Sequence, residues 1–259
     1  MKIGIFDSGI GGLTVLHQAM RVLPEERYLY YADADHVPYG EKTKGQIIRY
    51  ADQAIGFLRD LGAKADVVAC NTATSAAIGF LRKKYRFPIL GMEPAVKPAV
   101  ETCKGKRVMV VATPVTVRED KLKNLLQRVD REHAADLLAL PGLVSFAERE
   151  EFDTWRVREY LEEAFRPYDL TKYSALVLGC THFNYFKDTF AGIFPPGVAL
   201  IDGCRGTVNN LARILRETGL QGPGEPGADY FISGRKVEDA PTLQKIGRLH
   251  RRLEKMLRY

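Results

Sequence analysis

Short apolar runs alternate with longer amphipathic stretches along most of the chain. The runs are rich in β-branched and aromatic residues and predict buried strands, whereas the stretches between them are typical of helices. The predicted strands cover residues 2–6, 27–32, 66–69, 88–92, 107–112, 136–140, 175–178, 198–202 and 229–232. The predicted helices cover residues 13–22, 43–61, 72–85, 113–131, 143–151, 155–165, 207–217 and a charged C-terminal segment.

Strands that alternate with helices indicate parallel sheets covered by helices on both faces, which is the α/β class. A chain of 259 residues has room for two such domains. Because two segments of similar layout lie 110 residues apart, we expect two similar domains with a ligand in the cleft between them. The first domain is predicted to contain residues 1–95 and 208–259, and the second to contain residues 96–207.

The two similar segments each end in a cysteine. Residues 66–72 read Asp-Val-Val-Ala-Cys-Asn-Thr, and residues 175–182 read Ala-Leu-Val-Leu-Gly-Cys-Thr-His. Each cysteine, Cys70 or Cys180, is predicted to lie where a strand ends and a helix begins, with Asn71 or Thr72 as a helix N-cap. Ligands bind at this end of parallel strands, and free N–H groups there favour a thiolate.

Other polar residues also follow predicted strands. Asp7 and Ser8 open a glycine-rich turn that lacks the dinucleotide-binding spacing, so it either cradles an anion or is only a tight turn. The Pro38-Tyr39-Gly40 segment is by itself ordinary turn chemistry. Glu148 belongs to an acidic cluster that is most simply solvent-exposed.

Composition and charge limit the alternatives. The net charge is +6, and part of it lies in a basic cluster at the C-terminus. Nucleic-acid binding is one interpretation of this cluster. A solvated helix face is the better one, because acidic and apolar residues interrupt the cluster. The chain opens directly on a strand and contains no run long enough to span a membrane, so we expect a cytoplasmic protein. Four cysteines without a secretory signal argue against a disulfide framework. The basic residues concerned are Arg248, Arg251, Arg252, Lys255 and Arg258.

Two facing thiols allow several kinds of chemistry. One cysteine beside a histidine suggests a covalent nucleophile. A pair of cysteines suggests a redox disulfide, but the chain lacks the C-x-x-C motif of dithiol oxidoreductases. A zinc site is a further alternative, but the spacing of the cysteines and histidines does not match that of zinc ligands. Two thiols on opposite sides of one carbon can instead exchange a proton at a stereocentre without a cofactor or metal. Inert buried cysteines are the simplest alternative, and we interpret Cys103 and Cys204 in that way. His17, His36, His133 and His250 are likewise interpreted as ordinary residues.

Four ordered motifs together resemble the glutamate racemases of the aspartate/glutamate racemase superfamily. They are Phe-Asp-Ser-Gly-Ile-Gly-Gly-Leu-Thr-Val at 6–15, Pro-Tyr-Gly at 38–40, Ala-Cys-Asn-Thr-Ala at 69–73 and Leu-Gly-Cys-Thr-His-Phe at 178–183. The resemblance covers essentially the whole chain. It implies cofactor-independent interconversion of L- and D-glutamate, which supplies D-glutamate for peptidoglycan, and homodimers are common among members of the family.

The resemblance also implies roles for individual residues. Cys70 would remove the proton from D-glutamate with help from Asp7, and Cys180 would remove it from L-glutamate with help from His182. Asp33 and Glu148 would be further acidic residues near the site. The residues expected to hold the substrate are Ser8, Pro38, Tyr39, Gly40, Asn71, Thr72, Thr113, Thr116 and Thr181.

Several segments depart from the family pattern, among them residues 202–207 and the segment after Ser233, and two other departures lie closer to the predicted site residues. Leu140-Pro141 replaces a usual Cys-Pro, and Phe183-Asn184-Tyr185 replaces the Tyr-Pro-Leu that follows Cys-Thr-His in many members. Neither departure includes a thiol. The alternatives that stay open are an aspartate racemase with the same chemistry, a non-catalytic amino-acid-binding protein, and a nucleic-acid or protein-binding role of the basic terminal helix.

Overall fold

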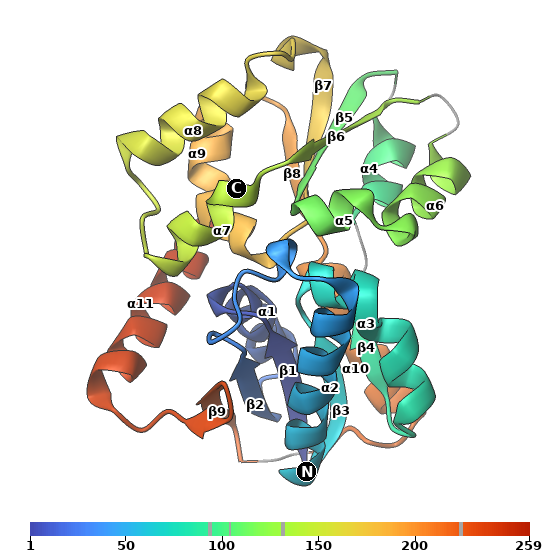
Figure 1. Cartoon of the computed structure of the whole chain (residues 1–259), viewed down its shortest axis with the longest axis vertical. Coiled ribbons are helices and arrows are strands. Elements are labelled where there is room, and N and C mark those ends of the chain that lie inside the picture. Colours follow the sequence, from blue (N-terminus) through green and yellow to red (C-terminus); the bar gives the residue numbers. More distant parts are fainter. Residues whose placement is uncertain (93–94, 104, 131–132, 223–224) are drawn as a thin grey trace.

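The computed structural model describes residues 1–92, 95–103, 105–130, 133–222 and 225–259. Within this part of the chain, ten strands form two sheets, which lie one above the other in Figure 1. All neighbouring strands are parallel except the short pair β9 and β10. The α/β class predicted from the sequence is therefore confirmed.

The first sheet has the strand order β10-β9-β2-β1-β3-β4, and the second has the order β6-β5-β7-β8. The strands of the first sheet are β1 Lys2–Asp7, β2 Arg27–Ala32, β3 Ala63–Val68, β4 Ile89–Gly91, β9 Gly227–Ile232 and β10 Arg235–Lys236. Those of the second are β5 Arg107–Ala112, β6 Ala135–Ala139, β7 Tyr173–Leu178 and β8 Ala199–Asp202.

Helices cover both faces of each sheet, as the alternating pattern predicts. The helices on the first sheet are α1 Leu13–Val22, α10 Cys204–Glu217 and α11 Ala240–Met256 on one face, with α2 Lys44–Asp60 and α3 Asn71–Lys84 on the other. Those on the second are α4 Val96–Thr102 and α6 Asp120–Val129 on one face, with α7 Pro141–Glu148, α8 Trp155–Phe165 and α9 Lys187–Ile193 on the other. The short helices are α5 Pro114–Arg118 and the 3₁₀ turns η1 Ile10–Gly12, η2 Tyr39–Glu41, η3 Leu170–Lys172 and η4 Thr181–Phe186.

One hydrophobic core joins the two sheets. The α1 face of the first sheet and the α7–α9 face of the second belong to the same cluster of buried side chains. The link between them is η4, whose Phe183, Tyr185 and Phe186 are each 0% exposed. The two sheets are therefore connected by packed apolar side chains at this edge.

Several details differ from the sequence prediction. The helix expected over residues 113–131 is two helices, α5 and α6, because the backbone at Glu119 is extended, and Arg131 lies outside the described residues. Helix α4 and strand β10 were not predicted. The domain boundaries stay a prediction; β4 ends at Gly91 before the second sheet begins, and α10 follows its last strand.

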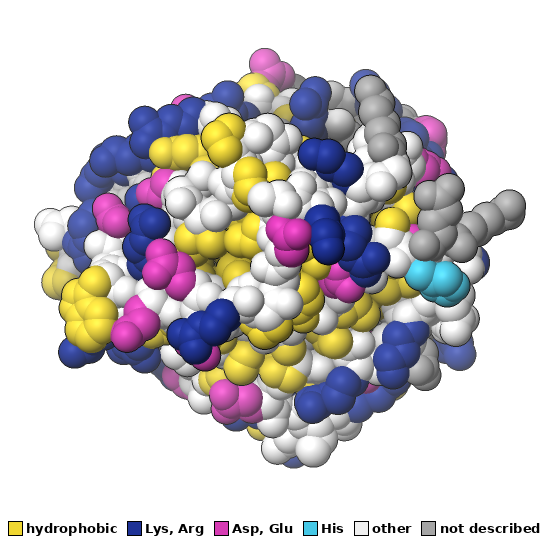
Figure 2. Space-filling view, turned by 90° about the horizontal axis from the view of Figure 1, so that it is seen from above, with side chains coloured by type: hydrophobic (Ala, Val, Ile, Leu, Met, Phe, Trp, Pro, Cys, Tyr) yellow, Lys and Arg dark blue, Asp and Glu magenta, His cyan; other side chains and the backbone are white. Residues whose placement is uncertain are grey.

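Most basic side chains of the C-terminal helix lie on the solvated face expected from its sequence, since Arg248, Arg251, Lys255 and Arg258 are exposed and Arg252 is the exception. Arg248 pairs with Glu150, and Arg252, with 16% of its side chain exposed, pairs with Asp188. Figure 2 shows one end of the molecule, where the described basic side chains are interspersed with acidic and hydrophobic ones. In the described residues, no helix is both long and apolar enough to cross a membrane.

Asp66 is a buried acid in the first sheet whose carboxyl group makes no hydrogen bond within the described structure. It lies in β3 opposite Gly4 of β1, is 0% exposed, and neither of its carboxylate oxygens has a partner. Burial therefore raises the pKa of Asp66 well above its usual value. The folded protein holds this carboxyl group neutral, whereas the unfolded chain ionises it near pH 4.

We expect Asp66→Asn to make the protein more stable than the wild type as pH rises. A raised folded-state pKa means that the stability from Asp66 is complete below the unfolded pKa and is lost above it, by up to about 1.4 kcal/mol per pH unit. Asparagine has the same shape and does not ionise. Thermal unfolding of both proteins at pH 5 and pH 8 measures the difference, and a Tm difference that is the same at both pH values would contradict this assignment.

Candidate active site

The carboxyl ends of β1, β3, β5 and β7 and the loop after β2 converge on one small cavity. Both Cys70 and Cys180 line it, one from each sheet. The lining residues are Ser8, Pro38, Tyr39, Gly40, Cys70, Asn71, Thr72, Thr113, Val144, Cys180, Thr181 and His182. All of them except Val144 are candidate residues from the sequence. Val144 belongs to the apolar face of α7, and nothing in its local pattern distinguishes it from a core residue.

Cys70 lies between β3 and α3. The helix begins at Asn71, so the N-cap is Cys70 itself and not Asn71 or Thr72 as expected; the sulfur accepts the N–H of Ala73 at 3.4 Å. The thiol donates to Ser8 Oγ at 3.6 Å. Burial raises the pKa of Cys70 to about 12, and the Asp7 carboxylate adds to the shift.

Cys180 follows β7 and precedes η4, a 3₁₀ helix. Its sulfur lies 3.8 Å from Nδ1 of His182, whose Nε2 lies 2.7 Å from Oε1 of Glu148. Burial alone would lower the pKa of His182, but hydrogen bonds with Cys180 and Glu148 and the charge of Glu148 raise it well above its usual value. Burial alone would raise the pKa of Glu148, but the hydrogen bond with His182 and the charge of His182 hold this pKa below its usual value. We therefore describe Glu148 and His182 as an ion pair beside Cys180.

Asp7 connects the two thiol environments. Its carboxylate accepts from Ser8 Oγ at 3.3 Å, from the N–H of Gly9 at 3.1 Å and from Thr181 Oγ1 at 3.0 Å. Asp7 therefore reaches Cys70 through Ser8 and the Cys180 segment through Thr181. Burial raises the pKa of Asp7, although the charge of His182 and the N–H of Gly9 oppose the shift.

Four candidate residues lie behind the cavity wall and hydrogen-bond to residues that form it. Asp7 and Glu148 do so as described above. The carboxylate of Asp33 accepts from the hydroxyl of Tyr39 at 2.6 Å and also from the ring of His36. Thr116 Oγ1 lies 3.0 Å from Thr113 Oγ1 and 3.3 Å from Thr72 Oγ1. His36, interpreted as an ordinary residue, is thus a neighbour of the site.

The glycine-rich turn at residues 9–12 packs directly against the ion pair. A Cβ at residue 9 would lie 1.9 Å from Oε1 of Glu148, and a Cβ at residue 11 would lie 2.4 Å from both His182 Nδ1 and Thr181 Oγ1. The N–H of Ile10 donates to the same Oε1 at 2.9 Å. Close packing, rather than an anion cradle, accounts for the glycines here.

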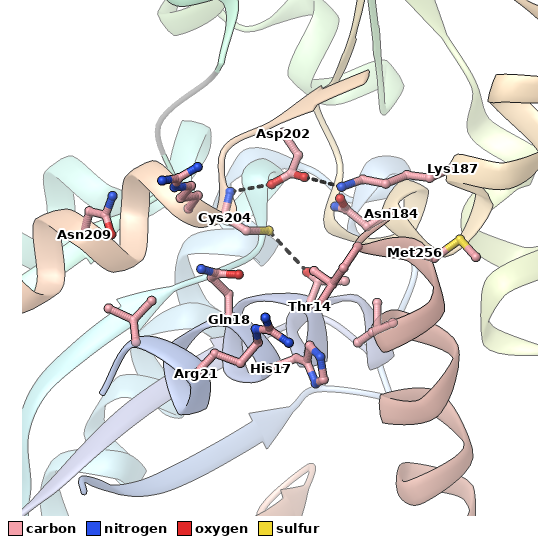
Figure 3. Close-up of a pocket in the computed structure, with 14 residues that line it drawn as sticks. Thr14, His17, Gln18, Arg21, Asn184, Lys187, Asp202, Cys204, Asn209 and Met256 are labelled. Carbon is pink, nitrogen blue, oxygen red and sulfur yellow. Dashed lines mark hydrogen bonds and ion pairs between the residues drawn. The ribbon is translucent and has the colours of Figure 1, made fainter. Parts of the chain in front are cut away.

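A second and larger cavity, of about 570 Å³, opens between α1, η4, α10 and α11 (Figure 3). None of the candidate residues lines it. Cys204, whose buried thiol donates to Thr14 Oγ1 at 3.6 Å, faces it together with the ion pair of Lys187 and Asp202. All four cysteines are free thiols, so Cys70 and Cys180 form no disulfide in this structure.

The chain is similar to known proteins over nearly its whole length. Residues 13–211 match the family model described as Asp/Glu/Hydantoin racemase. The chain is 54% identical to the glutamate racemase of Lachnospira eligens, over 99% of both chains. It is 46% identical to glutamate racemase 2 of Bacillus subtilis, over 100% of this chain and 98% of the relative.

Solved structures show the same architecture. A glutamate racemase isoform from Bacillus anthracis matches with a TM-score of 0.82 and 28% identity, over 100% of this chain and 94% of that one. The Escherichia coli glutamate racemase, solved with L-glutamate and the activator UDP-MurNAc-ala, matches with a TM-score of 0.82 and 28% identity over 95% of both chains. An aspartate racemase from Picrophilus torridus, 16% identical, covers 85% of this chain and 95% of that one with a TM-score of 0.60, and shows the fold alone. The chain therefore belongs to the Asp/Glu/hydantoin racemase family and, within it, to the glutamate racemases, which are isomerases.

Proposed function

We propose that the protein interconverts L- and D-glutamate by proton transfer between its two cavity thiols and the substrate. Starting from L-glutamate, the Cys180 thiolate takes the α-proton, which breaks the Cα–H bond and leaves a carbanion. The Cys70 thiol then gives its proton to the opposite face and becomes the thiolate. The observation that carries this proposal is the position of the two thiols, which come from different sheets and line one cavity.

The surroundings of the thiols support this assignment of roles. Because the pKa of Cys70 is raised, its sulfur keeps a proton at neutral pH in the free protein. A charged His182 lies 3.8 Å from the sulfur of Cys180 and stabilises a negative charge there. In the proposed reaction, the two thiols exchange their protonation states with each turnover from L- to D-glutamate.

The hydroxyl and amide groups of the cavity suit a dicarboxylate substrate. Ser8, Asn71, Thr72, Thr113 and Thr181 line it, and α3 directs its N-terminal N–H groups toward it. We propose that these groups bind the two carboxylates and stabilise the carbanion, so that the reaction needs no cofactor. Glutamate is favoured over aspartate because the relatives with about half of their residues identical are named glutamate racemases.

In the cell, we propose that the protein works in the cytoplasm and supplies D-glutamate for peptidoglycan. The resemblance to the glutamate racemases and the reaction proposed above support this role. The homodimer expected from the family resemblance stays a prediction.

Racemisation in deuterated water tests the two-thiol reaction. With L-glutamate and no added cofactor, the wild type is expected to produce D-glutamate that carries deuterium at Cα, followed by NMR and optical rotation. Cys70→Ala and Cys180→Ala are each expected to lose on the order of 10²–10⁴-fold in rate, which is typical of a missing general acid or base. L-Aspartate serves as the comparison substrate. If the wild type binds both amino acids and exchanges neither, the protein is a binding protein and the proposal fails.

Glu148→Gln is expected to change the pH dependence of kcat/KM. The neutral amide keeps the shape of the side chain but removes the charge that raises the pKa of His182, so His182 loses its proton at lower pH. Since the charged form exists below the pKa, the alkaline limb of the profile moves toward acid by about one unit or more. Glu151→Gln, which alters a carboxylate bonded to Arg149, is the control. A lower rate with an unmoved alkaline limb would disprove the electrostatic role.

Gly11→Ala is expected to reduce kcat on the order of 10²-fold while the protein stays folded. The added Cβ forces His182 and Thr181 to move, and a misplacement of about 1 Å at an active site has this effect. Gly79→Ala in α3 is the control, because its Cβ would meet no atom within 4 Å. That variant should keep full activity and gain about 0.5–1 kcal/mol of stability. Equal activities of the two variants would show that the contact at Gly11 is unimportant.

A further inference from the structure

Helix α11 presents three stripes of side chains to three different neighbours. Figure 1 shows it running along the side of the molecule from β9 toward α7. Its cationic stripe of Lys245, Arg248 and Arg252 contacts the second domain. Its apolar stripe of Ile246, Leu249 and Leu253 enters the core, and its third stripe of His250 and Glu254 contacts His17 of α1. The helical spacing of these residues therefore ties the first domain to the second.

The cationic stripe ends on the backbone that carries the site. Lys245 donates to the carbonyl of Glu148 at 3.3 Å. Arg252 donates to the carbonyl of Tyr185 at 2.8 and 3.0 Å and to the carboxylate of Asp188 at 2.6 Å. Its guanidinium also lies over the ring of Phe152, 5.5 Å from the centroid. These contacts fix both α7 and η4, the elements that carry Glu148 and His182.

Tyr185 continues the connection into the site. It is one of the residues that depart from the family pattern, and here it is 0% exposed and stacked on Phe152 with centroids 5.0 Å apart. Its hydroxyl donates to the carbonyl of Ile10 at 3.0 Å. The N–H of Ile10 in turn donates to Glu148, which holds His182. A continuous path of contacts thus leads from Arg252 to the ion pair beside Cys180.

We propose that Tyr185, held at its carbonyl by Arg252, is a positioning residue that keeps Ile10 in place to bind Glu148 against His182. The inference rests on the proposed racemisation. A leucine at this position would fill space but would offer no hydroxyl to Ile10. Burial raises the pKa of Tyr185 well above its usual value, so the hydroxyl remains a donor at every working pH.

The pH profile separates positioning from stability. His182 faces Cys180 from the end of β7, Glu148 from α7 and Asp7 from β1, and Lys245 of α11 lies close to Glu148. If Ile10 is released, Glu148 is held less firmly and the pKa of His182 falls. A hydrogen bond with a purely structural role would change the melting temperature and leave this pKa alone.

Tyr185→Phe is therefore expected to lower kcat about 5- to 10-fold with little change in KM, and to move the alkaline limb of kcat/KM toward acid. Tyr28→Phe is the matched control, because its buried hydroxyl donates to the carbonyls of Ala19 and Leu23, away from the site. That variant should melt at a lower temperature with an unchanged profile. If the wild type is active and Tyr185→Phe has the same kcat and the same pH profile as the wild type, the proposal is overturned.

A double-mutant cycle tests the route through Glu148. In the Glu148→Gln background, where the ion pair is already lost, Tyr185→Phe should change kcat by less than about twofold. If the double variant instead loses kcat by the product of the two single effects, the inference is overturned and the two-thiol reaction stays intact. Failure of that reaction would be seen separately, as the absence of deuterium exchange in the wild type. Arg252→Lys, which loses the paired contacts of the guanidinium, should lower kcat in the same direction, whereas exposed Arg251→Lys should not.

Discussion

Glu148 accepts the N–H of Ile10 at 2.9 Å and pairs with the ring of His182 at 2.7 Å, and these three groups come from three separate elements. His182 is 2% exposed, and a charged group in such surroundings is stable only when a partner of opposite charge lies against it. The backbone of η1 and the ends of α7 and η4 must therefore stay together. Because η1 follows β1 and η4 follows β7, the same contact sets the position of one sheet relative to the other. The distance between the two thiols depends on it.

The reaction has an equilibrium constant of one, since enantiomers have equal free energy in water, but the site is not symmetric. Cys70 is the N-cap residue of an α-helix and lies near Asp7, whereas Cys180 precedes a 3₁₀ turn and lies beside a cationic histidine. Thermodynamics requires kcat/KM to be equal in the two directions for the wild type and for every variant. The unequal surroundings can therefore change only which protonation state of the free protein predominates and how kcat and KM divide in each direction. The division between kcat and KM in each direction therefore depends on Asp7 and His182, which the fold places near different thiols.

Apolar periodicity is a local signal, so the sequence predicted the strands and most helices, and it placed both cysteines at strand ends. The family resemblance was needed for most of the other residues among the eleven candidates that line the cavity. The sequence did not predict how Asp7 reaches both thiol segments, since Asp7 and Thr181 are 174 positions apart. Its charged neighbours alone predict that Glu148 is a solvated acid, and the family resemblance was needed to place it near the site. Its ion pair with His182 was not predicted. The inward contacts of Arg252 in α11 were not predicted for the same reason, since Tyr185 and Asp188 lie far from it in the sequence. Asp66 belongs to a run that correctly predicts a strand, but the pattern cannot show that its carboxyl group lacks a partner.

The two edges of the cleft are held with very different strength. At the α11 edge, a continuous apolar core, several ion pairs and the buried Tyr185 join the sheets. At the opposite edge, where η2 meets α5, the joining contacts include the hydroxyl pair of Thr72 and Thr113 and a surface ion pair of Lys44 and Glu119. An exposed ion pair of this kind contributes only about 0–1 kcal/mol. Separating the sheets at the η2–α5 edge would break these polar contacts, whereas separating them at the α11 edge would also expose the apolar core that joins them.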